Sequence, residues 1–554
     1  MGFKQVNELR KSGQLQQAYD MAMSDWNQAP DDVWAARALF WTLHDMAFNE
    51  LNRGYPDEAA ALAERMQQLL PNMGEQEEAQ GEEHSLPERA MHRLVRHMQP
   101  FYADVKAAYL EARNGDTIAP YDFIAGLITD GQLAEPLHER AGWIIWHHLW
   151  RQQQRMPSIE ARQALAHYMS LTGVEAPSLL HSRIMVVAIR LSKRFTKEFD
   201  FAKFMDIWGE SNFMPEDWQR QERKSRHPGH PVQPGKFPAL TEAAAAQYIA
   251  CKKQQHDMTY SEDFMALLKK VVEQFPDRLE LKRYLSLALL SRGDKESALQ
   301  MHRDLAMKLN KYYVWHELAG MLTHDLDLKT SALCQALTMK AQENYVCDIH
   351  RELGWELARE GNMAAALCEL QIYHDTRQRY GWHKSWRYEQ LRKRIPADTV
   401  PTQDNHQLYA ERAKKIIEWV YSDLPAIHAI VVGRFRDKQG KDTAKLVMAD
   451  EKPLFVRANK IPADNYLQVR VLDDNGKLRL ATATAAPRDQ VVADFDNVVA
   501  GSVKVMQGQG GKQYGFVEGC FVPGHLLQGI ATGDSIAVLT EMQPDGRRRA
   551  IAIL

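Results

Sequence analysis

Cysteine is scarce in this chain, which has five among 554 residues, and no two of them form a C-x-x-C pair. A zinc ribbon and a thioredoxin-like motif are therefore both excluded. We expect reduced, mostly buried thiols at all five positions, which are Cys251, Cys334, Cys347, Cys368 and Cys520.

Long apolar runs are also missing from the sequence. The longest uninterrupted one is about six residues, Ile184 to Ile189, whereas a membrane-spanning helix needs roughly 20. The N-terminal residues 1–15 are polar and lack the apolar segment and cleavage site of a secretory signal. We expect a cytoplasmic protein with no membrane partner.

Catalytic and cofactor motifs are absent as well. The sequence contains no G-x-x-x-x-G-K-[ST] phosphate loop, G-x-S-x-G elbow, H-E-x-x-H helix or D-x-D-x-D-G calcium loop. The one glycine-dense loop, Gln507 to Gly511, is expected to join two strands, so that no helix N-terminus is available to hold phosphate. We expect a protein that is not an enzyme and that has no cofactor and no metal site.

What the chain does have is the length of several domains and an ordinary globular composition, with 45% hydrophobic and 25% charged residues. The net charge of −3 is unevenly distributed, because the part after Pro425 has 17 Lys and Arg against 14 Asp and Glu. This weakly basic tail permits a contact with an anionic partner but does not by itself indicate one.

A repeat of helical pairs organises the first two thirds of the chain. In residues 342–373, Leu353 and Gly354 are followed by Gly361 and Ala366. Small residues are needed where paired helices cross closely, and a glycine ends the first helix in a left-handed conformation. This spacing resembles the tetratricopeptide repeat, whose period is about 34 residues.

The same turn recurs elsewhere in the chain. Glycine and alanine have this spacing at Gly13 with Ala18, Gly54 with Ala59, and Gly293 with Ala298, while Pro30 and Pro71 each stand seventeen residues beyond their turn glycine. A degenerate unit opens with Trp315, Leu318 and Ala319, and its turn is predicted at Leu326 to Lys329. The resemblance to tetratricopeptide-repeat proteins thus covers much of residues 1–396.

Two segments of this region do not follow the repeat. Residues 85–215 are helical in composition but aperiodic, and their tryptophans and the adjacent His147 and His148 are interpreted mainly as packing residues. The stretch Gln219 to Phe237 is rich in proline, glycine and basic residues and cannot be a continuous helix. Its cations could contact phosphate, although a solvated loop is the commoner case; they are Arg220, Arg223, Lys224 and Arg226.

After Pro425 the pattern changes to short alternating strands separated by D-N-G and P-D-G turns. The sequence also matches itself here, because Leu454-Phe455-Val456 and Cys520-Phe521-Val522 are each followed by an Asn-Gly or Asp-Gly turn and a basic strand. We therefore predict two five-stranded barrels of oligonucleotide-binding type in tandem.

The second barrel resembles a cold-shock domain through Gly501-Ser502-Val503-Lys504, Lys512 to Val517, and Cys520 to Pro523. In that family, aromatic rings on the second and third strands stack on unpaired bases. Val505, Met506 and Pro523 depart from the family pattern and remove part of the platform. The residues that the resemblance and the basic turns assign to nucleic-acid binding are Lys504, Lys512, Tyr514, Phe516, Phe521, Phe455, Arg457, Arg547 and Arg548.

The predicted fold is thus an α-helical tetratricopeptide-like solenoid followed by two small all-β barrels of oligonucleotide-binding type. Its predicted parts are 1–84 and 239–396 (tetratricopeptide-like blocks), 85–215 (irregular helices), 216–238 (linker or loop), 397–424 (connecting helix), 425–487 and 488–554 (barrels). This combination resembles accessory proteins of bacterial conflict and anti-phage loci. The resemblance implies an adaptor that binds a protein partner through its helices and single-stranded RNA or DNA through its barrels; the alternative is a scaffold that binds only proteins.

Overall fold

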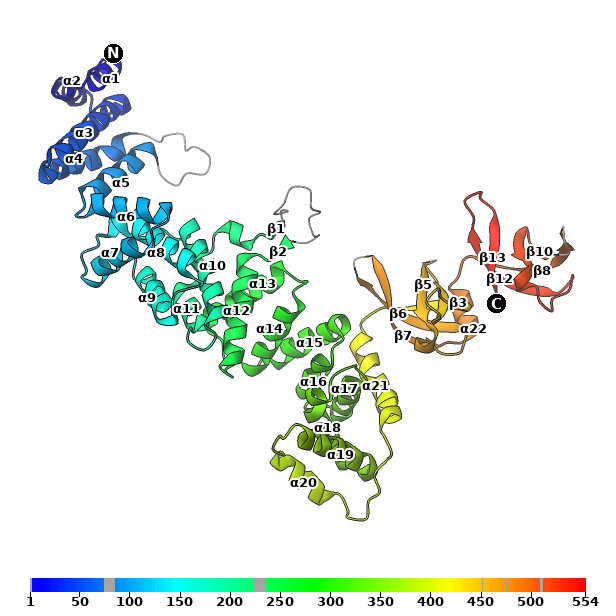
Figure 1. Cartoon of the computed structure of the whole chain (residues 1–554). Helices are drawn as coiled ribbons and strands as arrows, with labels where there is room; N and C mark the ends of the chain where they lie inside the picture. Colours follow the sequence, from blue (N-terminus) through cyan, green and yellow to red (C-terminus); the bar gives the residue numbers. More distant parts are fainter. Residues whose placement is uncertain (1, 74–84, 223–235, 451, 475, 509–511) are drawn as a thin grey trace. The chain divides into compact units, whose positions relative to one another are not determined.

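The computed structural model describes residues 2–73, 85–222, 236–450, 452–474, 476–508 and 512–554 (Figure 1). The chain divides into two compact units, unit 1 (Met1–Ala288) and unit 2 (Leu289–Leu554). Among the described residues, no helix combines the length and the apolar character that crossing a membrane requires.

Unit 1 is helical apart from one short ribbon. Its helices are α1 (Gly2–Lys11), α2 (Leu15–Gln28), α3 (Val33–Arg53), α4 (Pro56–Leu69), α5 (Leu86–Met98), α6 (Tyr102–Asn114), α7 (Ile118–Thr129), α8 (His138–Gln152), α9 (Ser158–Met169), α10 (Leu179–Arg194), α11 (Phe201–Trp208), α12 (Leu240–Gln254) and α13 (Glu262–Gln274), and the last to begin there is α14 (Leu279–Ser291).

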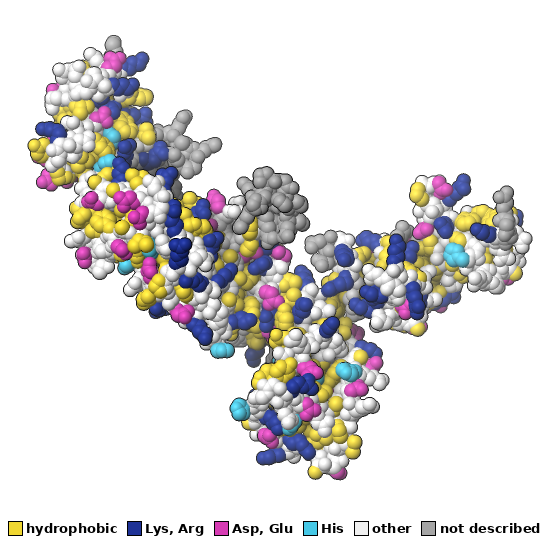
Figure 2. All heavy atoms as spheres, viewed as in Figure 1, with side chains coloured by type: hydrophobic (Ala, Val, Ile, Leu, Met, Phe, Trp, Pro, Cys, Tyr) yellow, Lys and Arg dark blue, Asp and Glu magenta, His cyan; other side chains and the backbone are white. Residues whose placement is uncertain are grey.

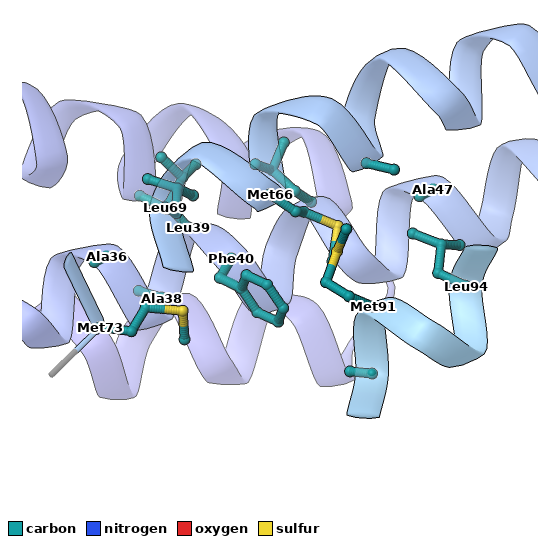
Figure 3. Packing of buried hydrophobic residues seen from close by; sticks show 14 of the residues in the cluster. Ala36, Ala38, Leu39, Phe40, Ala47, Met66, Leu69, Met73, Met91 and Leu94 are labelled. Carbon is teal, nitrogen blue, oxygen red and sulfur yellow. The ribbon is translucent and has the colours of Figure 1, made fainter. Parts of the chain in front are cut away.

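Polar caps and turns set the ends of these helices. The Asp32 carboxylate accepts a hydrogen bond from the Trp34 N–H at the start of α3, 2.9 Å away, which satisfies a donor that has no partner within the helix. Ser85 and Glu88 form a reciprocal capping box at the start of α5. In Figure 3, Phe40 of α3, Met66 of α4 and Leu94 of α5 lie in one apolar cluster, and all three are fully buried.

The predicted repeat turns are confirmed. Gly13, Gly54, Gly293 and Gly361 have φ angles of +77°, +87°, +89° and +87°, and each paired alanine, at positions 18, 59, 298 and 366, is fully buried. A Cβ atom on Gly354 would lie 3.3 Å from the Ala366 carbonyl oxygen. The two helices of this repeat therefore cross as closely as the sequence predicts.

One predicted turn is wrong. Leu326 to Lys329 form the first turn of α17 (Leu326–Leu337) and not a loop, because the Asp325 carboxylate caps this helix by accepting from the Leu328 N–H. The connection from α16 (Tyr312–Met321) is thus residues 322–325, one residue longer than the three-residue connections that contain Gly293 and Gly361.

Strands β1 (Gln221–Glu222) and β2 (Lys236–Phe237) pair antiparallel within the proline-rich stretch. Arg220, just before β1, makes hydrogen bonds of 2.7 and 2.8 Å to the buried carboxylate of Glu242 and also pairs with Asp277 at 2.9 Å. The Arg220 guanidinium is therefore occupied by ion pairs within the fold. Arg223, Lys224 and Arg226 lie outside the described residues.

The helical part of unit 2 ends in a helix that packs back on its neighbours. It comprises α15 (Lys295–Leu309), α16, α17, α18 (Glu343–Arg359), α19 (Met363–Arg379), α20 (Trp386–Arg394) and α21 (His406–Tyr421). The fully buried Glu369 carboxylate on α19 accepts from the Asn405 side chain at 2.6 Å and from the Tyr409 hydroxyl. Residues 405–421 are thus part of the helical core and more than a connection.

Two small sheets follow. The first has the order β5-β4-β3-β6-β7 and the second β8-β12-β13-β11-β10-β9. Their strands are β3 (Ala426–Arg436), β4 (Asp442–Met448), β5 (Pro453–Arg457), β6 (Tyr466–Asp474), β7 (Lys477–Ala485), β8 (Val498–Ser502), β9 (Lys504–Gln507), β10 (Gln513–Val517), β11 (Cys520–Pro523), β12 (Ser535–Met542) and β13 (Arg548–Ile553). In the second sheet, β8 and β9 are one interrupted strand whose halves lie on opposite edges, and β11 pairs with β13 in parallel.

Each sheet curls around its own apolar core, centred on residues such as Leu446 in the first and Val517 in the second. A third cluster joins them and includes Ile430 and Val447 of the first barrel, Phe495 after the short helix α22 (Arg488–Ala493), and Leu539 of the second barrel. The chain is therefore a tetratricopeptide-like helical solenoid followed by two small β-barrels, as the sequence predicts.

Candidate nucleic-acid interface

Strand β10 directs two aromatic rings away from the core of the second barrel. Gly515 and Val517 are buried, whereas Tyr514 is half-buried and Phe516 is 37% exposed, as the two-residue alternation of a strand requires. A side chain at Gly515 would be crowded, because a Cβ atom would lie 3.1 Å from the Lys504 carbonyl oxygen and 3.2 Å from Leu527.

The neighbouring strand β11 adds a third ring to the same face. Its core residues are Cys520 and Val522, which are 1% and 0% exposed, so the half-buried Phe521 points outward. Phe521 stands directly opposite Phe516. Ring centroids are 5.8 Å apart for Phe516 and Phe521, 6.0 Å for Tyr514 and Phe516, and 6.1 Å for Tyr514 and Phe521. We call these three residues the ring platform.

The flanking strands place cations beside the ring platform. Lys504 on β9 is in register with Phe516, and Arg549 on β13 is in register with Phe521; side chains of such cross-strand pairs lie on one face of the sheet. Glu541 stands opposite Arg549 on β12. Within the part of the chain that the structure describes, neither cation lies within ion-pair distance of a carboxylate.

The three residues that depart from the cold-shock pattern lie in different surroundings. Val505 packs against the barrel core, whereas Met506 is 38% exposed and in register with Tyr514, so it extends the platform with a thioether in place of a ring. Pro523 is buried opposite Tyr514.

The remaining predicted cations do not gather at the rings. Arg547 is exposed and lies 3.7 Å from the Asp545 carboxylate. Arg548 points to the junction of the barrels, where it lines a hollow of about 500 Å³ with Lys445 and Val447. Lys512 is exposed at the start of β10. Arg549 follows the same turn and stands in register with Phe521, and the buried Ala550 beside it indicates that the Arg549 side chain points outward.

The first barrel has a smaller aromatic site. Phe455 on β5 is 60% exposed and Phe435 on β3 is 44% exposed, with ring centroids 6.4 Å apart. They line a hollow of about 600 Å³ that also includes Arg457 and Lys477. Phe455 thus occupies the same outward position on its strand as Phe521, as the internal match of the sequence predicts.

Arg457 is held by its neighbours within this hollow. Its guanidinium lies 2.6 Å from the Asp437 carboxylate and donates to the Thr443 hydroxyl at 3.2 Å. The backbone N–H of Lys441 and the Arg457 guanidinium both stabilise the charged carboxylate and lower the pKa of Asp437 to about 2. Arg457 is therefore paired with a charged carboxylate at neutral pH, whereas Lys460 and Lys477 line the same hollow and have no ion pair among the described residues.

A separate groove lies in the helical part of unit 2. It has a volume of about 430 Å³ and is lined by Arg351 and Trp355 of α18 and by Trp386 of α20. Trp386 is 64% exposed. Arg394 covers the Trp355 ring at 4.6 Å.

The adjacent histidines of α8 diverge. His148 is buried, with Nδ1 3.0 Å from the Thr117 carbonyl oxygen and Nε2 3.1 Å from Glu160, and its ring stacks on Tyr121 at 4.1 Å. His147 lies on the outer side with Trp146. Among the described residues, no three His, Cys, Asp or Glu side chains are arranged to hold a metal ion.

Comparisons with known proteins add little to this geometry. A family model described as a domain of unknown function (DUF7017) matches residues 281–415, from within α14 to within α21. No curated protein matches the chain significantly.

Similar solved structures include the apo form of RapI, with 11% identity over 69% of this chain and 87% of that one, at a TM-score of 0.24. Yeast Tom70 has 12% identity over 76% of this chain and 89% of that one, at a TM-score of 0.24. The structure of Naa15/Naa10 bound to HypK-THB has 12% identity over 76% of this chain and 79% of that one, at a TM-score of 0.21. Scores this low carry no argument about function, so the site must be interpreted from its own geometry.

Proposed function

We propose that the protein is a non-catalytic adaptor that binds single-stranded RNA or DNA on the ring platform and a protein partner on its tetratricopeptide-like helices. The observation that carries the nucleic-acid part is that three mutually contacting rings lie outward on adjacent strands, with Lys504 and Arg549 beside them.

The strand order supports this assignment. Counting β8 and β9 as one strand, the second barrel has the strand order 1-4-5-3-2-1, which is that of a five-stranded Greek-key barrel of oligonucleotide-binding type. Such barrels bind unpaired nucleotides on the face of their second and third strands, and these are β10 and β11, the strands of the ring platform.

The chemistry of the face suits an unpaired strand. Each exposed ring can stack on a base with a gain of about 1–3 kcal/mol, whatever the base is. Lys504 and Arg549 are positioned to neutralise the phosphates between stacked bases, which makes binding salt-sensitive. Because stacking is tolerant of sequence, the proposal includes no preference for a particular base.

The protein partner is assigned to the groove of α18 and α20. Exposed tryptophans are enriched at the energetic centres of protein interfaces, and Trp386 stands at the rim of this groove. A role in anti-phage defence would come from that partner, and a cytoplasmic location agrees with five unpaired, buried thiols.

Fluorescence anisotropy of the full chain with labelled single-stranded RNA and DNA of about 16 nucleotides, a length chosen from site sizes of such barrels, tests the nucleic-acid part. We expect Tyr514→Ala with Phe521→Ala to weaken binding at least tenfold at low salt. The matched control is Phe435→Ala with Phe455→Ala in the first barrel, with an expected change below about threefold. Equal affinities for the platform variant and the unaltered chain would reject the ring platform, and no binding by either chain at low salt would favour the scaffold that binds only proteins.

Co-purification of the native chain, before and after nuclease treatment, tests the protein part. A partner that survives nuclease treatment and is lost in Trp386→Ala, but retained in the surface variant Tyr380→Ala, supports the groove. A partner lost on nuclease treatment alone contradicts it.

A further inference from the structure

Helix α8 of unit 1 presents a row of aromatic rings. Trp143, Trp146, His147 and Trp150 follow the spacing of one helix face and are all half-buried, whereas Ile144, Ile145, His148 and Leu149 of the opposite face are buried. Trp146 packs edge-on against Trp143 at 5.5 Å and stacks with Trp150 at 5.9 Å.

Helix α10 covers these rings with exposed arginines. The Arg183 guanidinium lies 6.0 Å from the centre of the Trp146 ring, and that of Arg190 lies 4.3 Å from the centre of Trp150. A guanidinium stacked on a ring keeps its N–H edge available for a further acceptor. The two helices thus display ordered hydrogen-bond donors along their outer side.

Helices α5 and α6 continue the same surface. Arg140 of α8 stacks on Tyr102 of α6 at 4.9 Å, and the Arg151 guanidinium donates to the Arg113 carbonyl oxygen at 3.0 Å. The Tyr102 ring in turn contacts His97 of α5, with ring centroids 4.0 Å apart. These contacts connect α5, α6, α8 and α10 into one continuous surface.

We call this surface the Arg–Trp face. It consists of Arg93, Lys106, Arg113, Arg140, Arg151, Arg183 and Arg190 with Tyr102, Trp143, Trp146 and Trp150. Figure 2 shows Lys and Arg side chains gathered over this part of unit 1, around α6, α8 and α10.

The cations of this face lack acidic partners. Across the described ranges of unit 1, none of the seven lies within 4 Å of a carboxylate oxygen, and the one ion pair at the border joins Arg96 to Glu139 at 3.7 Å. Arg93 of α5 stacks on the Phe48 ring at 5.7 Å. Seven cations without a carboxylate at ion-pair distance give this face a positive potential, which attracts an anionic ligand.

Burial and the positive charges of the face together lower the pKa values of two histidines. The pKa of His97 is lowered to about 4, first by burial and then by the charges of Arg93, Lys106 and Arg140. The pKa of His147 is lowered by burial and then by Arg151 and Arg113. Both ends of the face therefore disfavour a further positive charge.

We propose that the Arg–Trp face binds single-stranded nucleic acid, with its arginines on the phosphates and its half-buried rings against the bases. Arginine has a planar fork that matches phosphate, and planar rings suit bases. An acidic protein segment would use the charges alone and leave the interleaved tryptophans without a role. The site is in unit 1 and stands independently of the ring platform.

The test uses the full chain with the ring platform removed by Tyr514→Ala, Phe516→Ala and Phe521→Ala. Fluorescence anisotropy with mixed-sequence single-stranded RNA and DNA should still show salt-dependent binding. Adding Arg183→Gln and Arg190→Gln should then weaken binding about tenfold at low salt and reduce the slope of log K against log salt by about 1.4, since each phosphate contact contributes about 0.7. The matched control is Arg162→Gln with Lys269→Gln, which removes the same charge from exposed positions outside the face and should change neither value.

Three results would overturn the proposal. They are the absence of binding by the platform-deleted chain at low salt, equal losses in the arginine and control variants, and equally tight binding of a labelled polyglutamate peptide that competes with RNA. The last result would assign the face to an acidic protein segment. Photo-crosslinking with thiouridine-labelled RNA supplies a second measurement, and crosslinks should fall on α8 and α10; crosslinks confined to other helices contradict the assignment.

Discussion

The two barrels have related folds but differ in what surrounds their outward rings. In both, the third strand holds a phenylalanine between two buried residues, Phe455 in the first and Phe521 in the second. Beside Phe455, the cation Arg457 is already paired with Asp437 at 2.6 Å. Beside Phe521, Arg549 has no ion pair among the described residues. A barrel of this type thus supplies a surface, and the pairing of the cations nearest its rings is one property that sets how strongly an anion is attracted to that surface.

The rings differ in a second way. The first barrel has two rings that meet edge to face at 6.4 Å and 78°, whereas the second has three, each within 6.1 Å of the other two. Two or three stacked bases can therefore be accommodated on the second barrel and fewer on the first. The comparison predicts that the second barrel dominates binding.

The largest expected effect concerns the apolar cluster that joins the two barrels, and it tests whether each barrel folds as a separate module. Phe495 is 5% exposed in the cluster that joins them, whereas Phe455 is 60% exposed. We expect Phe495→Ala to destabilise the barrel region by about 3 kcal/mol, because a buried phenylalanine leaves a cavity. Calorimetry of the full chain should show a lower unfolding temperature for the transition of the barrel region.

Phe455→Ala is the control for this experiment, with an expected cost below about 1 kcal/mol because its ring is mostly in solvent. Equal costs for the two variants would mean that the joining cluster contributes no stability and that each barrel folds alone.

The sequence predicted those parts of the structure that depend on local geometry. Turn glycines such as Gly361, the close crossing at Gly354 and the outward direction of Tyr514 and Phe521 all follow from neighbours a few residues away. The start of α17 follows from Asp325, a typical capping residue, whereas the repeat spacing alone predicts a turn at this place.

Features that depend on distant residues could not be predicted. The parallel pairing of β11 with β13 brings Arg549 to Phe521, and no local pattern reports the neighbour of a strand in another hairpin. The Asp437–Arg457 pair spans twenty residues. On α8, the row of tryptophans was visible in the sequence, but the arginines of α10 that cover it became apparent only from the packing of the two helices.

The next effect concerns the cations of the ring platform. Lys504→Gln with Arg549→Gln should weaken binding of single-stranded RNA about tenfold at low salt and reduce the salt slope by about 1.4, as expected for two lost phosphate contacts. The control is Lys438→Gln with Arg547→Gln, two cations that do not face the rings. If both double variants reduce the slope of log K against log salt equally, the register of Lys504 and Arg549 with the rings has no influence on binding, and only the net charge does.

The smallest expected effect would make the first barrel more like the second. Asp437→Asn removes the carboxylate that neutralises Arg457, so a cation becomes available beside Phe455 and Phe435. One added phosphate contact should strengthen binding about threefold at low salt and raise the salt slope by about 0.7. Asp442→Asn is the matched control, because Asp442 pairs with the exposed Arg436 at 3.1 Å and does not line the hollow. If affinity and slope increase only in Asp437→Asn, the ion pair keeps the first barrel from binding; if neither variant changes them, the missing third ring, and not the paired charge, separates the two barrels.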